Sequence, residues 1–256
     1  MIRIGVPAAI AACAAASLLA ACSKGSEGLA GPTTPDYVGA WEGTTSQGKP
    51  VQFWLESDGA HLVTFADSIR GTTCTHRMVY VFAAEPPDTA IALTGGALSM
   101  VRSISSGTVN LSGTFGASAA SGSLMRTSTT CNGADTLTWT ASKVTAPLAN
   151  VTGTWDGTFS SSLVSSTAGT FVLAQSGATV SGTWNFANGG VGTISGTVVG
   201  NMGKVSIVET TPGCTGTFAG RASLHTSPSP VLFIGWAGSD CLGTHHHAGG
   251  FATPSP

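Results

Sequence analysis

The densest group of potential metal ligands lies near the C-terminal end of the chain. His245, His246 and His247 follow Asp240 after a short glycine-containing segment. Imidazole nitrogens and carboxylate oxygens are common ligands of transition metals. On a β-strand, His245 and His247 would point to the same face, within reach of Asp240. The spacing therefore predicts a candidate metal site of Asp240, His245 and His247, and the alternative is a histidine-rich loop that binds nothing.

The usual signatures of enzymes are missing from the sequence. It contains no Gly-x-Ser-x-Gly elbow, His-Glu-x-x-His helix, glycine-rich phosphate loop or calcium loop. The acidic residues are scattered, and Glu42 and Asp156, which occupy equivalent positions beside two tryptophans, are expected on the solvent face of their strands. We expect a non-enzymatic protein without a cofactor, with a hydrolase of dispersed catalytic residues as the enzymatic alternative.

A short apolar segment at the N-terminus ends in Leu19-Ala20-Ala21-Cys22. An aliphatic residue, two small residues and a cysteine resemble the lipobox of bacterial lipoproteins, and residues 1–21 fit the signal peptide that precedes it. The resemblance implies cleavage before Cys22, acylation of that cysteine and a lipid anchor in the membrane of the bacterial cell envelope. Ser23 at the next position implies the outer membrane. The remaining alternative is a plain secretory signal with a chance cysteine.

Four cysteines remain when Cys13 of the signal segment and Cys22 are set aside: Cys74, Cys131, Cys214 and Cys241. An even number of cysteines in an exported protein predicts disulfides, and their spacing is unlike that of zinc ligands. Three connectivities are possible. We favour Cys74–Cys131 and Cys214–Cys241, because each pair then falls inside one half of the chain.

The composition excludes several functional classes. Charged residues make up only 9% of the chain and the formal net charge is −2, so there is no basic patch for nucleic acid. Hydrophobic residues make up 42%, which is more than a disordered chain contains. Short strand-like runs separated by glycine-containing turns predict an all-β protein.

The chain divides into a short N-terminal part and two similar halves. Residues 22–36 read as a flexible tether, residues 37–144 as a first β domain and residues 150–252 as a second. The halves open alike, because Gly39-Ala40-Trp41-Glu42-Gly43-Thr44 matches Gly153-Thr154-Trp155-Asp156-Gly157-Thr158. We therefore predict two tandem antiparallel up-and-down β-barrel or sandwich domains.

The second half resembles the first hairpin of avidin-type barrels, and the wider lipocalin-like group also opens on a Gly-x-Trp strand. The similarity lies in Gly153-Thr154-Trp155, Gly169-Thr170-Phe171 and Gly182-Thr183-Trp184. It covers about 35 residues and implies an antiparallel barrel of about eight strands. The later tryptophan- and tyrosine-bearing strands of avidin have no counterpart here, so biotin binding is not implied.

Tryptophans in apolar strands provide the best indication of a binding site. Trp184 and Trp236 are the candidate ligand-binding residues if the second barrel is hollow. The bulky side chains of Phe171, Leu173 and Ile207 can fill that interior instead. We expect an envelope-anchored lipoprotein with a binding or scaffold role toward an envelope protein, and the alternative is a carrier of a small apolar ligand.

Overall fold

The computed structural model describes residues 36–256, except for 66–67, 71–74, 78–79, 86–87, 105–106, 129–132 and 227–228. Every regular element described is a β-strand. The strands of the first half are β1 Gly39–Thr45, β2 Pro50–Glu56, β3 Gly59–Phe65, β4 Ser68–Arg70, β5 Thr75–Arg77, β6 Tyr80–Ala83, β7 Leu93–Thr94, β8 Ala97–Ile104, β9 Gly107–Phe115, β10 Ala119–Ser128 and β11 Gly133–Val144. Those of the second half are β12 Gly153–Ser160, β13 Thr167–Ser176, β14 Thr179–Phe186, β15 Val191–Val199, β16 Met202–Thr211, β17 Cys214–His225, β18 Val231–Asp240 and β19 Gly243–Pro254.

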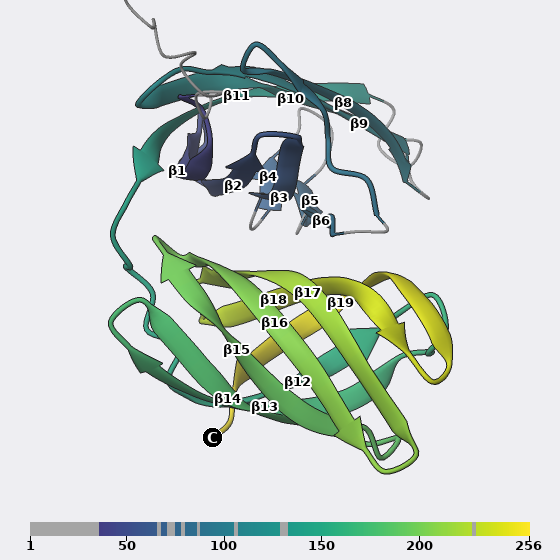
Figure 1. The fold of residues 1–256 in the computed structure, drawn as a ribbon. Helices are drawn as coiled ribbons and strands as arrows, with labels where there is room; N and C mark the ends of the chain where they lie inside the picture. Colours follow the sequence, from purple (N-terminus) through teal and green to yellow (C-terminus); the bar gives the residue numbers. More distant parts are fainter. Residues whose placement is uncertain are drawn as a thin grey trace, which may run out of the picture. The chain divides into compact units, whose positions relative to one another are not determined.

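The second half is a closed antiparallel barrel of the eight strands β12 to β19 (Figure 1). Each strand pairs with the next along the chain, and β12 pairs with β19 to complete the circle. Side chains alternate between the interior and solvent, as a strand requires. In β13, Phe171 and Leu173 are buried, whereas Val172 between them is 48% exposed. The predicted up-and-down barrel is confirmed for this half.

The first half forms a nine-stranded antiparallel sheet with the order β6-β3-β2-β1-β11-β10-β9-β8-β7, together with a separate β4–β5 hairpin. The segment before β7 returns to β3, where Ala60 and Ile91 exchange two backbone hydrogen bonds of 2.8 and 3.1 Å. The sheet thereby curls into a second barrel-like layer. The all-β architecture of two tandem barrel-like sheets agrees with the prediction from the sequence.

Aromatic side chains form much of the hydrophobic core that the first sheet encloses. Trp41, Phe53, Phe115 and Trp139 are each at most 3% exposed. Their rings pack against one another, with centroids 4.6 Å apart for Phe53 and Trp139 and 5.3 Å apart for Trp41 and Phe115. Such pairs contribute beyond the area they bury.

The internal repeat is visible in the strand register. Trp41 lies opposite Phe53 between β1 and β2, and Trp155 lies opposite Phe171 between β12 and β13. Each indole N–H donates a hydrogen bond to the carbonyl four residues earlier, at 2.8 Å in the first half and 2.9 Å in the second. The two halves therefore open with the same hairpin and the same fixed tryptophan.

A glycine in each opening strand allows close approach of the neighbouring backbone. A Cβ atom at Gly43 would lie 1.8 Å from the carbonyl oxygen of Thr140, and one at Gly157 would lie 2.0 Å from that of Phe251. Neither contact is sterically possible, so glycine is required where the sheets bend. This explains why Gly43 and Gly157 recur in the repeat.

The connector between β11 and β12 lies against the turn between β15 and β16. The N–H of Gly200 donates to Ala146 at 2.7 Å, and the carbonyl of Gly200 accepts from Leu148 and Ala149 at 2.9 Å each. Residues 35–256 cluster as one compact unit. Independent folding of residues 37–144 and 150–252 stays a prediction. Within the described part of the chain, no helix is long and apolar enough to cross a membrane.

Candidate functional site

The interior of the second barrel is filled at one end and hollow at the other. Aliphatic side chains close the end near the start of β12 and leave a void of only about 30 Å³ there: Val151, Leu173, Val180, Ile194, Val205 and Leu224. A larger cavity of about 80 Å³ lies at the opposite end. Residues of the loops that join β12 to β13, β14 to β15 and β18 to β19 contribute to its lining.

Aromatic rings form most of the apolar lining of this cavity. Trp184 and Trp236, the two candidate ligand-binding residues, both line it together with Phe159, Phe186 and Phe218. Phe186 lies at the centre of the cluster, with its ring centroid 4.7 Å from that of Trp184 and 5.3 Å from that of Phe159. The indole N–H of Trp184 is buried and has no hydrogen-bond partner among the described residues. The interior is therefore hollow at the end that both predicted tryptophans line.

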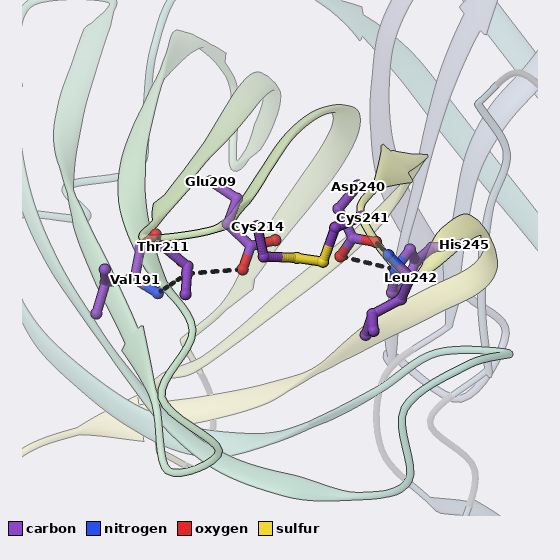
Figure 2. The surroundings of a disulfide bond; sticks show 8 residues. All are labelled: Val191, Glu209, Thr211, Cys214, Asp240, Cys241, Leu242 and His245. Atoms are coloured by element: carbon purple, nitrogen blue, oxygen red, sulfur yellow. Dashed lines mark hydrogen bonds and ion pairs between the residues drawn. A yellow bond between two sulfur atoms is a disulfide. The ribbon is translucent and has the colours of Figure 1, made fainter.

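Two acids stand at the rim of the cavity. Glu209 is the last buried residue of β16 and is 9% exposed. Its carboxylate accepts a hydrogen bond from the hydroxyl of Thr211 at 2.7 Å, and that hydroxyl accepts one from the N–H of Val191 at 3.0 Å (Figure 2). Burial is the main reason that the pKa of Glu209 is raised, and the negative charge of Asp240 adds to the increase.

Asp240 ends β18 and lies beside His245 of β19. Its Oδ1 accepts the N–H of Leu242 at 2.7 Å, and its Oδ2 lies 3.0 Å from Nε2 of His245. Burial acts to raise the pKa of Asp240, but the contacts with His245 and Leu242 outweigh it and hold that pKa below its usual value. The pKa values of the two acids are therefore shifted in opposite directions, up for Glu209 and down for Asp240.

The orientation of His245 is set by Ser161, in the loop after β12. The Oγ of Ser161 accepts hydrogen bonds from the N–H groups of Leu163 at 3.2 Å and Val164 at 3.0 Å. Its own hydrogen is then left for Nδ1 of His245, 2.8 Å away. Nδ1 therefore faces the Ser161 hydroxyl, and Nε2 faces the carboxylate of Asp240.

The rim is covalently closed by the disulfide Cys214–Cys241, with a Cα–Cα distance of 4.9 Å (Figure 2). It joins the start of β17 to the turn after β18, directly beside Asp240. This is one of the two bonds expected from the sequence. The other two cysteines, Cys74 and Cys131, and the proposed lipidation site Cys22 lie outside the described residues.

The comparisons with known proteins find similar solved structures but do not assign the chain to a family. Neither the family models nor the curated proteins contain a match to the chain. One similar solved structure is a DUF3598-family protein of unknown function from Nostoc punctiforme, which is 13% identical, with 85% of this chain and 95% of that chain covered and a TM-score of 0.25. Another is a double mutant of transferrin binding protein B from Haemophilus parasuis, which is 12% identical, with 81% and 53% covered and a TM-score of 0.24. No function follows from similarity at this level.

The expected metal set is only partly assembled. Asp240 and His245 are adjacent. His247 turns to Asp88 instead, and its backbone N–H donates a hydrogen bond to Oδ2 of Asp88 at 2.9 Å. The reason is an irregularity of β19, where the register with β18 shifts between Trp236 and Gly238 and His247 adopts a φ of 48°. Strand alternation therefore fails between His245 and His247, and the three-ligand prediction is wrong.

Glu209 and Ser161 are the site residues that reasoning from the sequence missed. Glu209 could have been found, since it continues the inward series of Val205 and Ile207 along β16. Ser161 could not have been found in this way. It lies in a loop, and its partner His245 is 84 positions further along the chain.

A second cluster of ionisable groups surrounds Arg221, which is fully buried. Its guanidinium contacts the carboxylates of Glu85 and Glu56, and the distance from Nη2 to Oε1 of Glu56 is 2.5 Å. The guanidinium also lies 5.6 Å from the ring centre of Trp54. Lys204 contacts the same Glu56 at 3.1 Å. Two basic groups already neutralise these acids, so the cluster is an ion-pair network and not a metal site.

His61 belongs to the same network and carries two protons. Its Nδ1 faces the carbonyl of Ala84 at 2.7 Å, and its Nε2 faces the carboxylate of Asp58 at 2.9 Å. Both neighbours are acceptors, so both ring nitrogens must donate. Burial acts to lower the pKa of His61, but the acceptors of Glu85, Asp58 and Ala84 outweigh it and raise that pKa to about 9.

The two equivalent acids of the repeat have different surroundings. Asp156 is exposed, as expected, and accepts hydrogen bonds from Thr170 and Ser255. Glu42 is half-buried instead, because its carboxylate accepts the backbone N–H and the side-chain amide of Asn201. The expectation of a solvent-facing acid is therefore wrong for Glu42, which is covered by the turn between β15 and β16.

Proposed function

We propose that this protein is a non-enzymatic binding protein of the bacterial cell envelope whose second barrel holds a small ligand. The observation that carries the proposal is the cavity of about 80 Å³ lined by Trp184 and Trp236. Concave, mostly aromatic sites with a few converging polar groups are typical of ligand pockets. Leu242 lines the mouth of the cavity and is 61% exposed, so an apolar guest can contact it from solvent.

The arrangement of Ser161, His245 and Asp240 supports binding over catalysis. A nucleophilic serine needs a free lone pair for attack. Both lone pairs of the Ser161 hydroxyl are engaged by the N–H groups of Leu163 and Val164. The hydroxyl therefore orients the imidazole at the rim, and the carriage of a ligand is the function that the site supports best.

The cavity is tested by filling it. Val164 lines the mouth from the loop after β12, so Val164→Phe places a ring in the opening. Val172 of the same barrel points to solvent and provides the control Val172→Phe. Tryptophan fluorescence titrated with the neutral alcohol 3,3-dimethyl-1-butanol is expected to change for the unmodified protein and for Val172→Phe, and at least about tenfold less for Val164→Phe.

If this alcohol and the charged probes used below all leave the fluorescence unchanged, the carrier function is rejected. In that case, an envelope scaffold with a closed barrel would be the better reading. Equal responses from the Val164→Phe and Val172→Phe variants would place binding outside the cavity.

The envelope location rests on Leu19-Ala20-Ala21-Cys22. We expect Cys22→Ser to abolish acylation and to release the protein from the membrane fraction of an expressing bacterium. Cys13→Ser, in the segment that would be removed, is the matched control and should leave fractionation unchanged. Mass spectrometry that finds an unmodified mature N-terminus elsewhere would rule out the lipid anchor.

A further inference from the structure

The acids that line the cavity outnumber its basic side chains. Glu209, Asp240 and His245 are the ionisable residues of the lining, and no lysine or arginine is among the residues around it. His245 is paired with Asp240, since its Nε2 lies 3.0 Å from Oδ2 of that residue. Glu209 has no ion pair with a basic side chain among the described residues, so the lining has two acids and a single histidine.

The acids are also withdrawn from water. Glu209 is 9% exposed, and the side chain of Asp240 is 5% exposed. Burying two carboxylates close together is unfavourable unless a cation or a shared proton compensates. The pKa of Glu209 is raised in agreement with this cost, and burial is the main cause. A positively charged guest would compensate the two carboxylates.

A second, independent feature of the cavity also lacks a partner. Trp184 is 5% exposed and lines the cavity, and its indole N–H has no hydrogen-bond partner among the described residues. Its Nε1 would lie 2.7 Å from a Cβ atom at Gly192, so the nitrogen occupies interior space that this inward-facing glycine leaves open. A buried donor of this kind favours a guest that brings an acceptor oxygen.

The aromatic lining matches the same guest. The faces of tryptophan and phenylalanine rings carry partial negative charge and attract alkylammonium groups, which also have apolar surfaces. Trp184, Trp236 and Phe218 line the same cavity as the two acids. The space corresponds to about five to eight water-sized positions, which suits a guest of similar heavy-atom number.

We propose that the cavity takes a small organic cation, an ammonium compound with apolar carbon atoms and one acceptor oxygen. The ammonium group lies at Glu209 and Asp240, the carbon atoms lie against the aromatic rings, and the oxygen accepts the Trp184 N–H. This inference rests on the proposed function, that the cavity binds a ligand.

Three probes of one shape and different charge provide the test. Choline is the cation, 3,3-dimethyl-1-butanol is its neutral isostere and 3,3-dimethylbutyrate is the anion. Each is titrated into the soluble Cys22→Ser protein at about pH 8, where an ordinary glutamate is ionised, with calorimetry and tryptophan fluorescence as readouts. We expect choline to bind at least about tenfold more tightly than the alcohol, and the anion to bind most weakly.

Two variants assign the effect to the acid. Glu209→Gln keeps the shape and the oxygen that accepts from Thr211, and is expected to weaken choline binding about tenfold with little change for the alcohol. Asp156→Asn removes an exposed carboxylate from the outer face of the same barrel and should change neither. Thermal melts of both variants check that the barrel is folded, and if Glu209→Gln is unfolded, Asp240→Asn takes its place.

A quaternary ammonium group can be free or part of a lipid headgroup, so a second arm uses vesicles. Binding of free choline assigns a free cation, whereas binding to phosphatidylcholine vesicles but not to choline or to phosphatidylglycerol vesicles assigns a headgroup. The inference is overturned if the alcohol binds as tightly as choline and phosphatidylcholine vesicles do not bind, or if Glu209→Gln leaves cation binding unchanged. Binding of the alcohol alone would refute the cation but retain the proposed carrier function.

Discussion

The Oγ of Ser161 lies 2.8 Å from Nδ1 of His245, although the two residues are 84 positions apart in the sequence. This contact holds the loop after β12 to the start of β19 across the mouth of the barrel. Ser161 also accepts hydrogen bonds from two backbone N–H groups of its own loop. The same hydroxyl therefore fixes both the loop conformation and the orientation of the His245 ring.

Ser161→Ala is expected to destabilise the barrel by about 1–3 kcal/mol, because it leaves Nδ1 of His245 and two N–H groups without their partner. The free energy of unfolding from urea titrations is the measurement. Ser195→Ala, on the exposed face of β15, is the control and should change it by less than about 0.5 kcal/mol. Equal effects of the two changes would argue against the contact.

Removal of the Cys214–Cys241 bond is expected to cost about 3.5 kcal/mol. The two cysteines are 27 positions apart, and the loss of that loop constraint from the unfolded chain accounts for a value of this size. The double variant Cys214→Ser/Cys241→Ser, compared with the unmodified protein in urea under oxidising conditions, measures it. A change below about 1 kcal/mol would show that the rim is held mainly by non-covalent contacts.

His61 makes stability fall at alkaline pH. Its folded-state pKa of about 9 lies above the ordinary value of 6.5, so its contribution is fully present below pH 6.5 and is lost as the pH rises through about 9. The shift of the pKa from 6.5 to about 9 corresponds to a contribution on the order of 3 kcal/mol. Unfolding free energies measured across this window should fall for the unmodified protein and change less for His61→Gln. His246→Gln is the control, since the ring of His246 is partly exposed, and a parallel decline of both variants would contradict the assignment.

Arg221→Met is expected to destabilise the folded protein by about 3–5 kcal/mol, because it leaves Glu85 and Glu56 without the buried cation between them. Lys204→Met removes a cation from the same Glu56, but the lysine side chain is 53% exposed, so the expected loss is below about 1 kcal/mol. Thermal or urea unfolding of the two variants gives the comparison. Losses of similar size would mean that burial of the guanidinium is unimportant.

Several features of the fold followed from local patterns in the sequence. The repeated Gly-x-Trp openings predicted two similar halves, and Trp41 and Trp155 indeed face Phe53 and Phe171 in the same register. Period-two alternation and glycine-rich turns predicted an all-β chain, because a strand that faces a core on one side has no other pattern available. The pairing of Cys214 with Cys241 followed from their position in one half.

The site depended on contacts that no local pattern contains. The sequence named Trp184 and Trp236, but only the tertiary structure decided that the interior is filled near Leu173 and Ile194 and hollow near the tryptophans. Which end of a barrel is filled depends on how side chains from all eight strands share one volume.

The metal prediction also shows that a local pattern does not determine which side chains meet. Asp240 and His245 are adjacent, as the spacing predicted, but an irregularity in β19 turns His247 toward Asp88. Sequence alone determined which residue types alternate along each strand, because alternation is a property of one strand. Tertiary structure decided which acids, rings and hydroxyls meet at the rim, because that depends on strand register and on loops that close over the barrel.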